Sequence, residues 1–277
     1  WAAESLARDG DFAAPWTTVF HSGSAHVIAL GMACGMDSYA AAVVMMALAS
    51  ALSVYLMACI LRELGGDGGW GLLALASFAF GFQFVRLPAD VYSESFALPC
   101  VLLSLLLALR GRAARSAAAA ALAYVFRPEA ILALLATLVL VRREDGRSAR
   151  RERGIALGVA ALGVAAYAVG AAIAGGQGVA TTPKLDFMLP LGPLGALRDG
   201  AWAGALERLG HNVTRLPGAA VGGLDFAVFF VGIASLFPAR ARRARFVRVA
   251  VLWMGAHLAV LLAFQVKPRF FLMLAPL

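Results

Sequence analysis

Long apolar segments separated by arginine-rich loops are the feature that most constrains this chain. The 277 residues are 61% apolar, and 15 of the 24 Lys and Arg residues lie in four short loops between apolar runs. A soluble domain has no interior large enough for so many such segments, whereas the hydrocarbon core of a bilayer accepts them directly. The pattern therefore predicts an all-α fold, a polytopic transmembrane helical bundle. The arginine loops are at 62, 110–115, 142–153 and 240–248.

The arginine loops also predict an orientation. Loops rich in Lys and Arg stay on the cytoplasmic side of a membrane, so residues 1–38 and 86–94 are expected on the outer side. The net charge of +8 then reports orientation and does not indicate nucleic-acid binding, because the basic loops contain almost no aromatic residues on which bases would stack. A composition rich in Ala, Gly and Arg, with only two Lys, favours a bacterial protein of the inner membrane.

Apolar run lengths separate predicted spans from other segments. Residues 22–35 rise only about 21 Å as a helix, less than the roughly 30 Å hydrocarbon core, so they are expected to form an outer juxtamembrane helix. Residues 175–218 are expected to form a large outer loop. The predicted spans are Tyr39–Leu61, Trp70–Phe84, Ser95–Leu109, Ile155–Ala174, Ala219–Phe237 and Val249–Gln265.

A short hairpin is expected between the second and third arginine loops, because both loops lie on the same side. The sequence divides at Arg127-Pro128 into two helices, Ala117–Phe126 and Ile131–Val141, each too short to cross comfortably. A re-entrant-like helical hairpin with its tip at this dipeptide satisfies both length and charge. Proline suits the start of the second helix because its missing N–H needs no partner there.

The whole chain is interpreted as one transmembrane domain, residues 1–277. It begins at Trp1 and ends at Leu277 inside an apolar run, and is expected to be truncated at both ends. Cys34, Cys59 and Cys100 lack metal-ligand spacing and are interpreted as small apolar fillers. No metal site is predicted, and whether a divalent metal takes part is left open. Walker, Gly-x-Ser-x-Gly and His-Glu-x-x-His motifs are absent from the sequence.

Polar residues on the expected outer side are the candidates for chemistry. Arg86, Asp90 and Glu94 lie together between two predicted spans. A carboxylate there either acts as a base, holds a metal or a sugar hydroxyl, or simply caps the helix that follows. At the hairpin tip, Arg127 and Glu129 either serve a function or neutralise each other.

A second group of candidates lies near the two ends of the chain. Lys267 and Arg269 break the arginine asymmetry and either bind a phosphate or anchor to lipid headgroups. His21 and His26 lie at the expected outer interface and either hydrogen-bond a ligand or are passive.

Four stretches together resemble the GT-C fold integral-membrane glycosyltransferases, the group that includes protein O-mannosyltransferases and aminoarabinose transferases. WAAESLARDGDF at 1–12 is similar to the segment after the first outer acid, and YSESFALPCVLLSLLLALRG at 92–111 to the second outer acid with its span. ALAYVFRPEAILALLATLVLVRR at 121–143 resembles the Arg-Pro hairpin, and KPRFFLMLAPL at 267–277 a late span with an Arg at its outer end.

The resemblance implies an inverting enzyme that moves a sugar from a polyprenyl-phosphate carrier to a glycan, lipid or protein acceptor at the outer face. Glu94 or Asp90 would be the second-loop acid, and the family's principal acid would lie before Trp1. Arg269 would contact the phosphate, with Arg127 in support and Lys267, Arg86 and His21 nearby. These groups are expected to line one water-facing site. The partners implied are the bilayer and the lipid-linked sugar; no cofactor is certain.

A transporter or a flippase for lipid-linked substrates is the alternative interpretation. A re-entrant hairpin with an intramembrane arginine also occurs along transport paths. Transporters of that kind carry paired half-helices in two related repeats, whereas only one such hairpin is evident here. A third class, a scaffold without activity, predicts that Glu94, Arg127 and Arg269 tolerate replacement by alanine.

Overall fold

The computed structural model describes residues 2–17, 22–64, 94–140, 146–174 and 192–223, with isolated positions at 72, 75–76 and 79. All regular structure in these ranges is helical. Three α-helices run from the amino end: α1 (Ala2–Glu4), α2 (Gly23–Ala33) and α3 (Ser38–Glu63). Next come α6 (Glu94–Leu109), α7 (Ala113–Phe126), α8 (Leu134–Leu140) and α9 (Gly146–Ile173). Two further helices follow, α11 (Pro193–Arg198) and α12 (Trp202–Gly223), and the shorter turns are η1 (Ser5–Asp9), η2 (Ala14–Thr17) and η3 (Pro128–Ala133).

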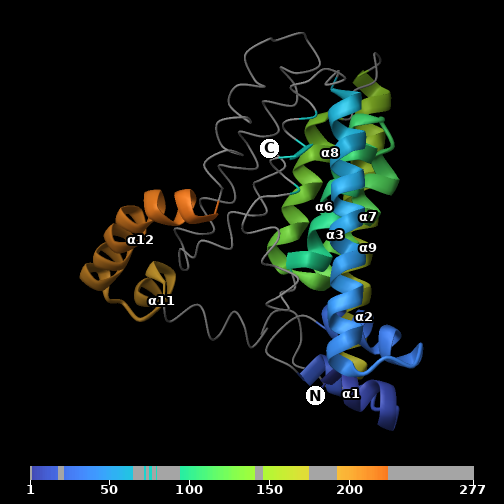
Figure 1. The fold of residues 1–277 in the computed structure, drawn as a ribbon. Coiled ribbons are helices and arrows are strands. Elements are labelled where there is room, and N and C mark those ends of the chain that lie inside the picture. The colour runs from blue at the N-terminus through green and yellow to red at the C-terminus, as the bar shows by residue number, and fades with distance from the viewer. Residues whose placement is uncertain are drawn as a thin grey trace.

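Helices α3, α6, α7, α8 and α9 form one elongated bundle (Figure 1). The carboxyl end of α3 meets that of α6, where Arg110 pairs with Glu63 at 2.7 Å. The chain then turns at Gly111, whose φ of 70° is a left-handed conformation that glycine adopts without strain. Two hydrogen bonds, Gly111 N–H to Ala108 and Arg112 N–H to Leu107, close α6 in a Schellman motif. Helix α7 therefore returns antiparallel to α6.

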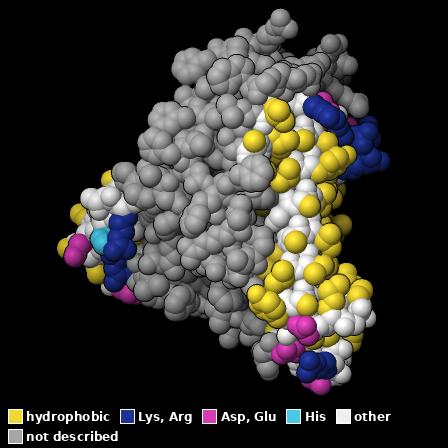
Figure 2. All heavy atoms as spheres, viewed as in Figure 1, with side chains coloured by type: hydrophobic (Ala, Val, Ile, Leu, Met, Phe, Trp, Pro, Cys, Tyr) yellow, Lys and Arg dark blue, Asp and Glu magenta, His cyan; other side chains and the backbone are white. Residues whose placement is uncertain are grey.

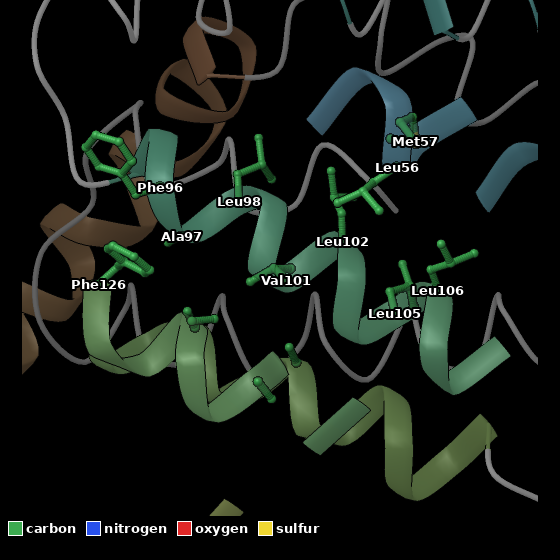
Figure 3. Close-up of a cluster of buried hydrophobic side chains, with 14 of the residues drawn as sticks. Leu56, Met57, Phe96, Ala97, Leu98, Val101, Leu102, Leu105, Leu106 and Phe126 are labelled. Carbon is green, nitrogen blue, oxygen red and sulfur yellow. The ribbon is translucent and has the colours of Figure 1, made fainter. Parts of the chain in front are cut away.

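The core of the bundle lies between α3, α6 and α7. Leu56 and Met57 of α3 meet the leucine-rich face of α6, and Phe96 stacks on Phe126 of α7 with ring centroids 5.9 Å apart (Figure 3). Helix α6 is enclosed almost all round, with Val101, Leu102 and ten further residues buried. Because α6 is apolar on nearly all faces, it suits a central position, and α3, α7, η3 and α8 pack against it.

Two helices, Ser38–Glu63 and Ala149–Ile173, are long and apolar enough to cross a membrane, with mean hydropathies of 2.3 and 2.0 over their best windows. They are also mostly uncovered, since only 28% and 17% of those windows are buried. Figure 2 shows the result as a broad apolar face between a cluster of Lys and Arg side chains at one end and a mixed acidic and basic group at the other. Soluble monomers rarely expose a continuous apolar surface of this extent.

Small and hydroxyl-bearing residues join the helices closely. A Cβ added at Gly163 of α9 would lie 2.5 Å from the Cβ of Ala121 in α7. The buried hydroxyls of Ser104, Ser116 and Thr137 link α6, α7 and α8, with Ser104 Oγ 2.9 Å from the Ser116 carbonyl and Ser116 Oγ 2.5 Å from Thr137 Oγ1. Close approach of small residues and interhelical hydroxyl bonds are both typical of helix packing in lipid.

The predicted hairpin is present, with different bounds. Its first helix begins at Ala113 rather than Ala117 and ends at Phe126 as expected, and the second limb begins as the tighter η3 before becoming α8. The prediction for 175–218 was incomplete. Residues 192–223 contain α11 and α12, and α12 runs through the boundary placed at 218. Among the described helices, the predicted span Ser95–Leu109 forms a shorter apolar helix, not one of the two that are long enough to cross. The predicted spans Trp70–Phe84, apart from isolated positions, Val249–Gln265, and Ala219–Phe237 after Gly223 lie outside the described residues.

Candidate functional site

A buried ion pair joins the start of α6 to the turn after α7. Arg127 Nη1 contacts Glu94 Oε1, and the side chains are only 4% and 2% exposed. The two residues are distant in sequence but close in space because α6 and α7 are antiparallel around Gly111. Both lie sixteen or seventeen positions from that glycine, so the hairpin brings them to one level. This pairing is a feature that the sequence analysis missed, and the hairpin symmetry is the signal that identifies it.

The backbone at Arg127 is set by the proline that follows. Arg127 has φ −151° and ψ 128°, the extended conformation to which a residue before proline is restricted. Helix α7 therefore ends at Phe126, and Pro128 begins η3, where its missing N–H leaves no broken hydrogen bond. This break turns the guanidinium of Arg127 toward the amino end of α6.

Glu94 occupies the first turn of α6, where the positive end of the helix dipole favours a carboxylate. The pair is buried, and Phe96 and Phe126, which lie one or two positions from its two residues in the sequence, stack on each other. Solvent screening is weak in such surroundings, so the two charges interact more strongly than a surface pair does. The site residue Glu94 was expected to face water, and the structure buries it instead.

The pair also lies well inside the length of the bundle. Arg110 and Glu63 fix a common level at one end; from there α6 rises about 24 Å to Glu94, whereas α3 spans about 38 Å to Ser38. Glu94 is thus about 14 Å short of the far end of α3. Figure 1 agrees, since α3 extends beyond the ends of α6 and α7 on the side of the bundle where α2 lies.

Ser95 adds unmet hydrogen-bonding capacity beside the pair. Its side chain is 2% exposed, and its Oγ has no hydrogen-bond partner in the described part of the chain. Pro99, within the same helix, has no N–H to donate to the Ser95 carbonyl. A buried polar group without a partner lowers the stability of the fold by about 1–3 kcal/mol. A serine at this position is therefore not explained by packing alone.

A second polar group adjoins the turn from the side of α2 and α9. The Ser22 N–H donates to the Tyr167 hydroxyl at 3.2 Å, and His26 Nδ1 lies 2.8 Å from the Ser22 carbonyl. Tyr167 also meets Tyr124 of α7 edge to face, with centroids 5.6 Å apart. His26 is a candidate from the sequence, whereas Tyr167 looks like an ordinary residue of an apolar run, so its hydrogen bond to Ser22 is not predicted.

The other predicted site residues lie outside the described residues. These are His21, Arg86, Asp90, Lys267 and Arg269. Only Glu94 and Arg127 are seen to lie together in the described part of the chain, so the convergence of the other residues on the same site stays a prediction. Arg127 pairs with Glu94, and the side chain of Glu129 lies outside the described residues, so neutralisation of Arg127 by Glu129 stays a prediction. Within the described ranges, no three His, Cys, Asp or Glu side chains gather as metal ligands would.

Comparisons with protein-family models, with curated proteins and with solved structures found no match to this chain. The family resemblance therefore rests on the short sequence stretches alone, and the chemistry must be argued from the ion pair and its position.

Proposed function

We propose that this chain is a multi-pass glycosyltransferase of a bacterial inner membrane, which moves a sugar from a polyprenyl-phosphate carrier to an acceptor at the outer face. One observation carries the proposal. Glu94 and Arg127 come from two separate stretches that resemble the GT-C enzymes, and they form one buried ion pair. The pair lies past the middle of the bundle, in the half away from Arg110, which is the half expected to face outward.

The depth of the pair supports a role beyond packing. Helices α3 and α9 are long enough to span, which would place Glu94 within the hydrocarbon layer, about 14 Å from the amino end of α3. Charges at that depth are costly, and they are retained mainly where they line substrate or ion pathways. An apolar pair of similar volume would stabilise the bundle as well or better.

The chemistry of transfer needs a cation and a carboxylate together. The acceptor hydroxyl oxygen attacks the anomeric carbon, the bond from that carbon to the phosphate oxygen breaks, and the electron pair leaves with the polyprenyl phosphate. A carboxylate takes the proton of the hydroxyl. A guanidinium stabilises the charge that grows on the leaving phosphate, and its planar donors suit phosphate oxygens as well as carboxylate oxygens.

The ion pair provides both groups in a mutually neutralised resting form. We assign Arg127 as a contact of the donor phosphate, which would compete with Glu94 for the guanidinium. Glu94 released in this way would be the proton acceptor, with Asp90 as the other candidate carboxylate. Arg269, Lys267, Arg86 and His21 complete the proposed binding site on the strength of the resemblance alone.

Replacing Glu94 by glutamine tests the assignment. Glu94→Gln keeps the size of the side chain and removes its charge, so sugar transfer should fall by about 10²-fold or more. The assay measures transfer from tritiated undecaprenyl-phosphate sugars, supplied one at a time, to membrane acceptors. Glu63→Gln is the matched control, because Glu63 also pairs with an arginine but at the opposite end, and it should leave transfer unchanged. Near-normal turnover in Glu94→Gln would remove this residue from the site.

The same reconstituted protein distinguishes the transporter alternative. A buried ion pair among helices is also compatible with a path for a lipid-linked substrate. A flippase would move the carrier between leaflets of a vesicle without forming a new glycosidic bond. Carrier movement that depends on Glu94, with no transfer to any acceptor, would favour that class over the glycosyltransferase.

A further inference from the structure

Helix α12 carries an apolar stripe that stays largely exposed in the described part of the chain. Trp202, Leu206, Leu209 and Val213 follow one another at spacings of four, three and four residues, which places them on one face of a helix. Their exposed fractions are 72%, 69%, 38% and 51%, respectively. Exposure of large apolar side chains to water is unfavourable, so a stripe of this kind indicates a surface that binds protein or lipid.

The opposite face of α12 is polar and carries charge. Glu207, Arg208, His211, Thr214 and Arg215 are all exposed and lie between 120° and 240° around the helix from Trp202, at about 100° per residue. Figure 2 shows Lys or Arg and His side chains side by side on the visible face of this helix. Polar and apolar residues are thus fully separated around the helix.

The flank of α12 between these two faces is already occupied. Ala205 and Asn212 are buried, and Arg208 donates to the Gly192 carbonyl at 3.3 Å, which ties α12 to the start of α11. Because this internal packing uses a different flank, it leaves the stripe free. Leu194 and Leu197 of α11 are also 40% and 36% exposed.

We infer that α12 lies in the plane of the outer membrane interface, with its apolar stripe in the lipid and Trp202 at the headgroup level. This inference rests on the membrane location in the proposed function. Three observations favour lipid as the occupant. The α12 sequence leads at Ala219 into an apolar run long enough to span, and α9, the last span before it, ends at Ile173 on the same side as Glu94. Strong separation of the two faces with modest overall hydropathy is also the pattern of helices that lie on bilayers, where Trp and basic residues favour the interface.

Site-directed fluorescence on the full chain tests this inference. Cys34, Cys59 and Cys100 are replaced by alanine, and a single cysteine is introduced as Leu206→Cys or His211→Cys and labelled with bimane. The protein is reconstituted into vesicles of phosphatidylcholine and phosphatidylglycerol. Quenching by brominated lipid is then compared with quenching by iodide in the water.

The two positions should respond in opposite ways. The label at 206 should be quenched by brominated lipid and shielded from iodide, and the label at 211 should show the reverse. Equal iodide quenching at both positions would overturn the inference in favour of a helix in water. Shielding of position 206 from both quenchers would overturn it in favour of packing against protein, including a second copy.

A third label separates this inference from the proposed function. Leu52→Cys lies in the middle of α3, where Leu52 is 48% exposed. Lipid quenching at 52 without lipid quenching at 206 would sink the inference for α12 alone. Absence of lipid quenching at 52 would contradict the membrane spans themselves, and the transfer assay remains a separate measure of activity.

Discussion

Burial of a glutamate beside an arginine lowers the stability of a helical bundle through the loss of hydration of both charges. Each charge gives up its hydration, and their mutual attraction repays this cost only where geometry and surroundings are favourable. Glu94 and Arg127 are 2% and 4% exposed next to two stacked phenylalanines, so little water remains to share the charge. Loss of one partner would remove the charge that directly contacts the other, whereas loss of both would remove the two buried charges together.

A double-mutant cycle measures this asymmetry. Arg127→Met alone should lower the free energy of unfolding by about 3 kcal/mol, because it removes the cation that contacts the buried Glu94 carboxylate. Glu94→Leu combined with Arg127→Met should recover most of that loss. Thermal unfolding of the detergent-solubilised protein provides the measurement. A double variant whose loss equals the sum of the losses of Arg127→Met and Glu94→Leu measured singly would show that the two side chains are not energetically coupled.

The same double variant separates structure from function at these residues. If the pair belongs to the transfer site, the variant folds but does not transfer sugar. Full transfer by a stable Glu94→Leu, Arg127→Met protein would limit the pair to a structural role and contradict the proposed function.

The sequence predicted part of this arrangement. The conformational restriction of a residue before proline predicted that α7 ends next to Arg127. The charge of Glu94 beside a predicted span made it a candidate site residue. Their pairing was missed because it depends on register between two helices, and register is set by the Gly111 turn rather than by either residue. Burial of Glu94 was missed for a related reason: α6 lies at the centre of the bundle, which no local pattern reveals.

Between elements, the contact of α7 with α9 depends on the absence of a single methyl group. Ala121 and Gly163 face each other across helices lined by Ala113, Ala117 and Ala160, so the backbones approach closely. Dispersion contacts between small residues replace the hydrophobic effect where helices associate in lipid. Hydrophobic runs predicted that these helices exist and nearly where their carboxyl ends lie, but α9 begins at Gly146 rather than at the predicted Ile155. The runs also carry no information on which small residues meet.

Two glycine substitutions in α9 test this contact. Gly163→Ala places a Cβ 2.5 Å from that of Ala121, so the helices must separate and the protein should lose about 1–3 kcal/mol of stability. Gly158→Ala is the matched control, because no atom lies within 4 Å of the added carbon. It should be neutral or stabilise by up to about 1 kcal/mol, since alanine is the better helix former. Equal melting temperatures for the two variants would show that α7 and α9 are not packed this closely.

Over the whole molecule, charge differs between the two ends of the bundle. Arg62, Arg110, Arg112 and Arg115 lie at one end with the arginines that open α9. The other end carries Glu4, whose carboxylate accepts a hydrogen bond from Ser38 Oγ at 2.7 Å. That bond holds the pKa of Glu4 below its usual value, so this acid stays charged at neutral pH. The positive-inside rule then predicts that the arginine end faces the cytoplasm.

Native Cys34 allows this orientation to be measured. It is exposed between α2 and α3, at the end opposite to Gly111, while Arg112 is exposed beside that glycine. With Cys59 and Cys100 replaced by alanine, a membrane-impermeant maleimide should label Cys34 in intact cells. In a variant that also carries Cys34→Ala, a cysteine introduced as Arg112→Cys should be labelled only after permeabilisation. Labelling of both cysteines from one side would mean that the bundle does not cross the membrane end to end. The reverse pattern would place the Glu94 end of the bundle in the cytoplasm, which would contradict the proposed transfer at the outer face.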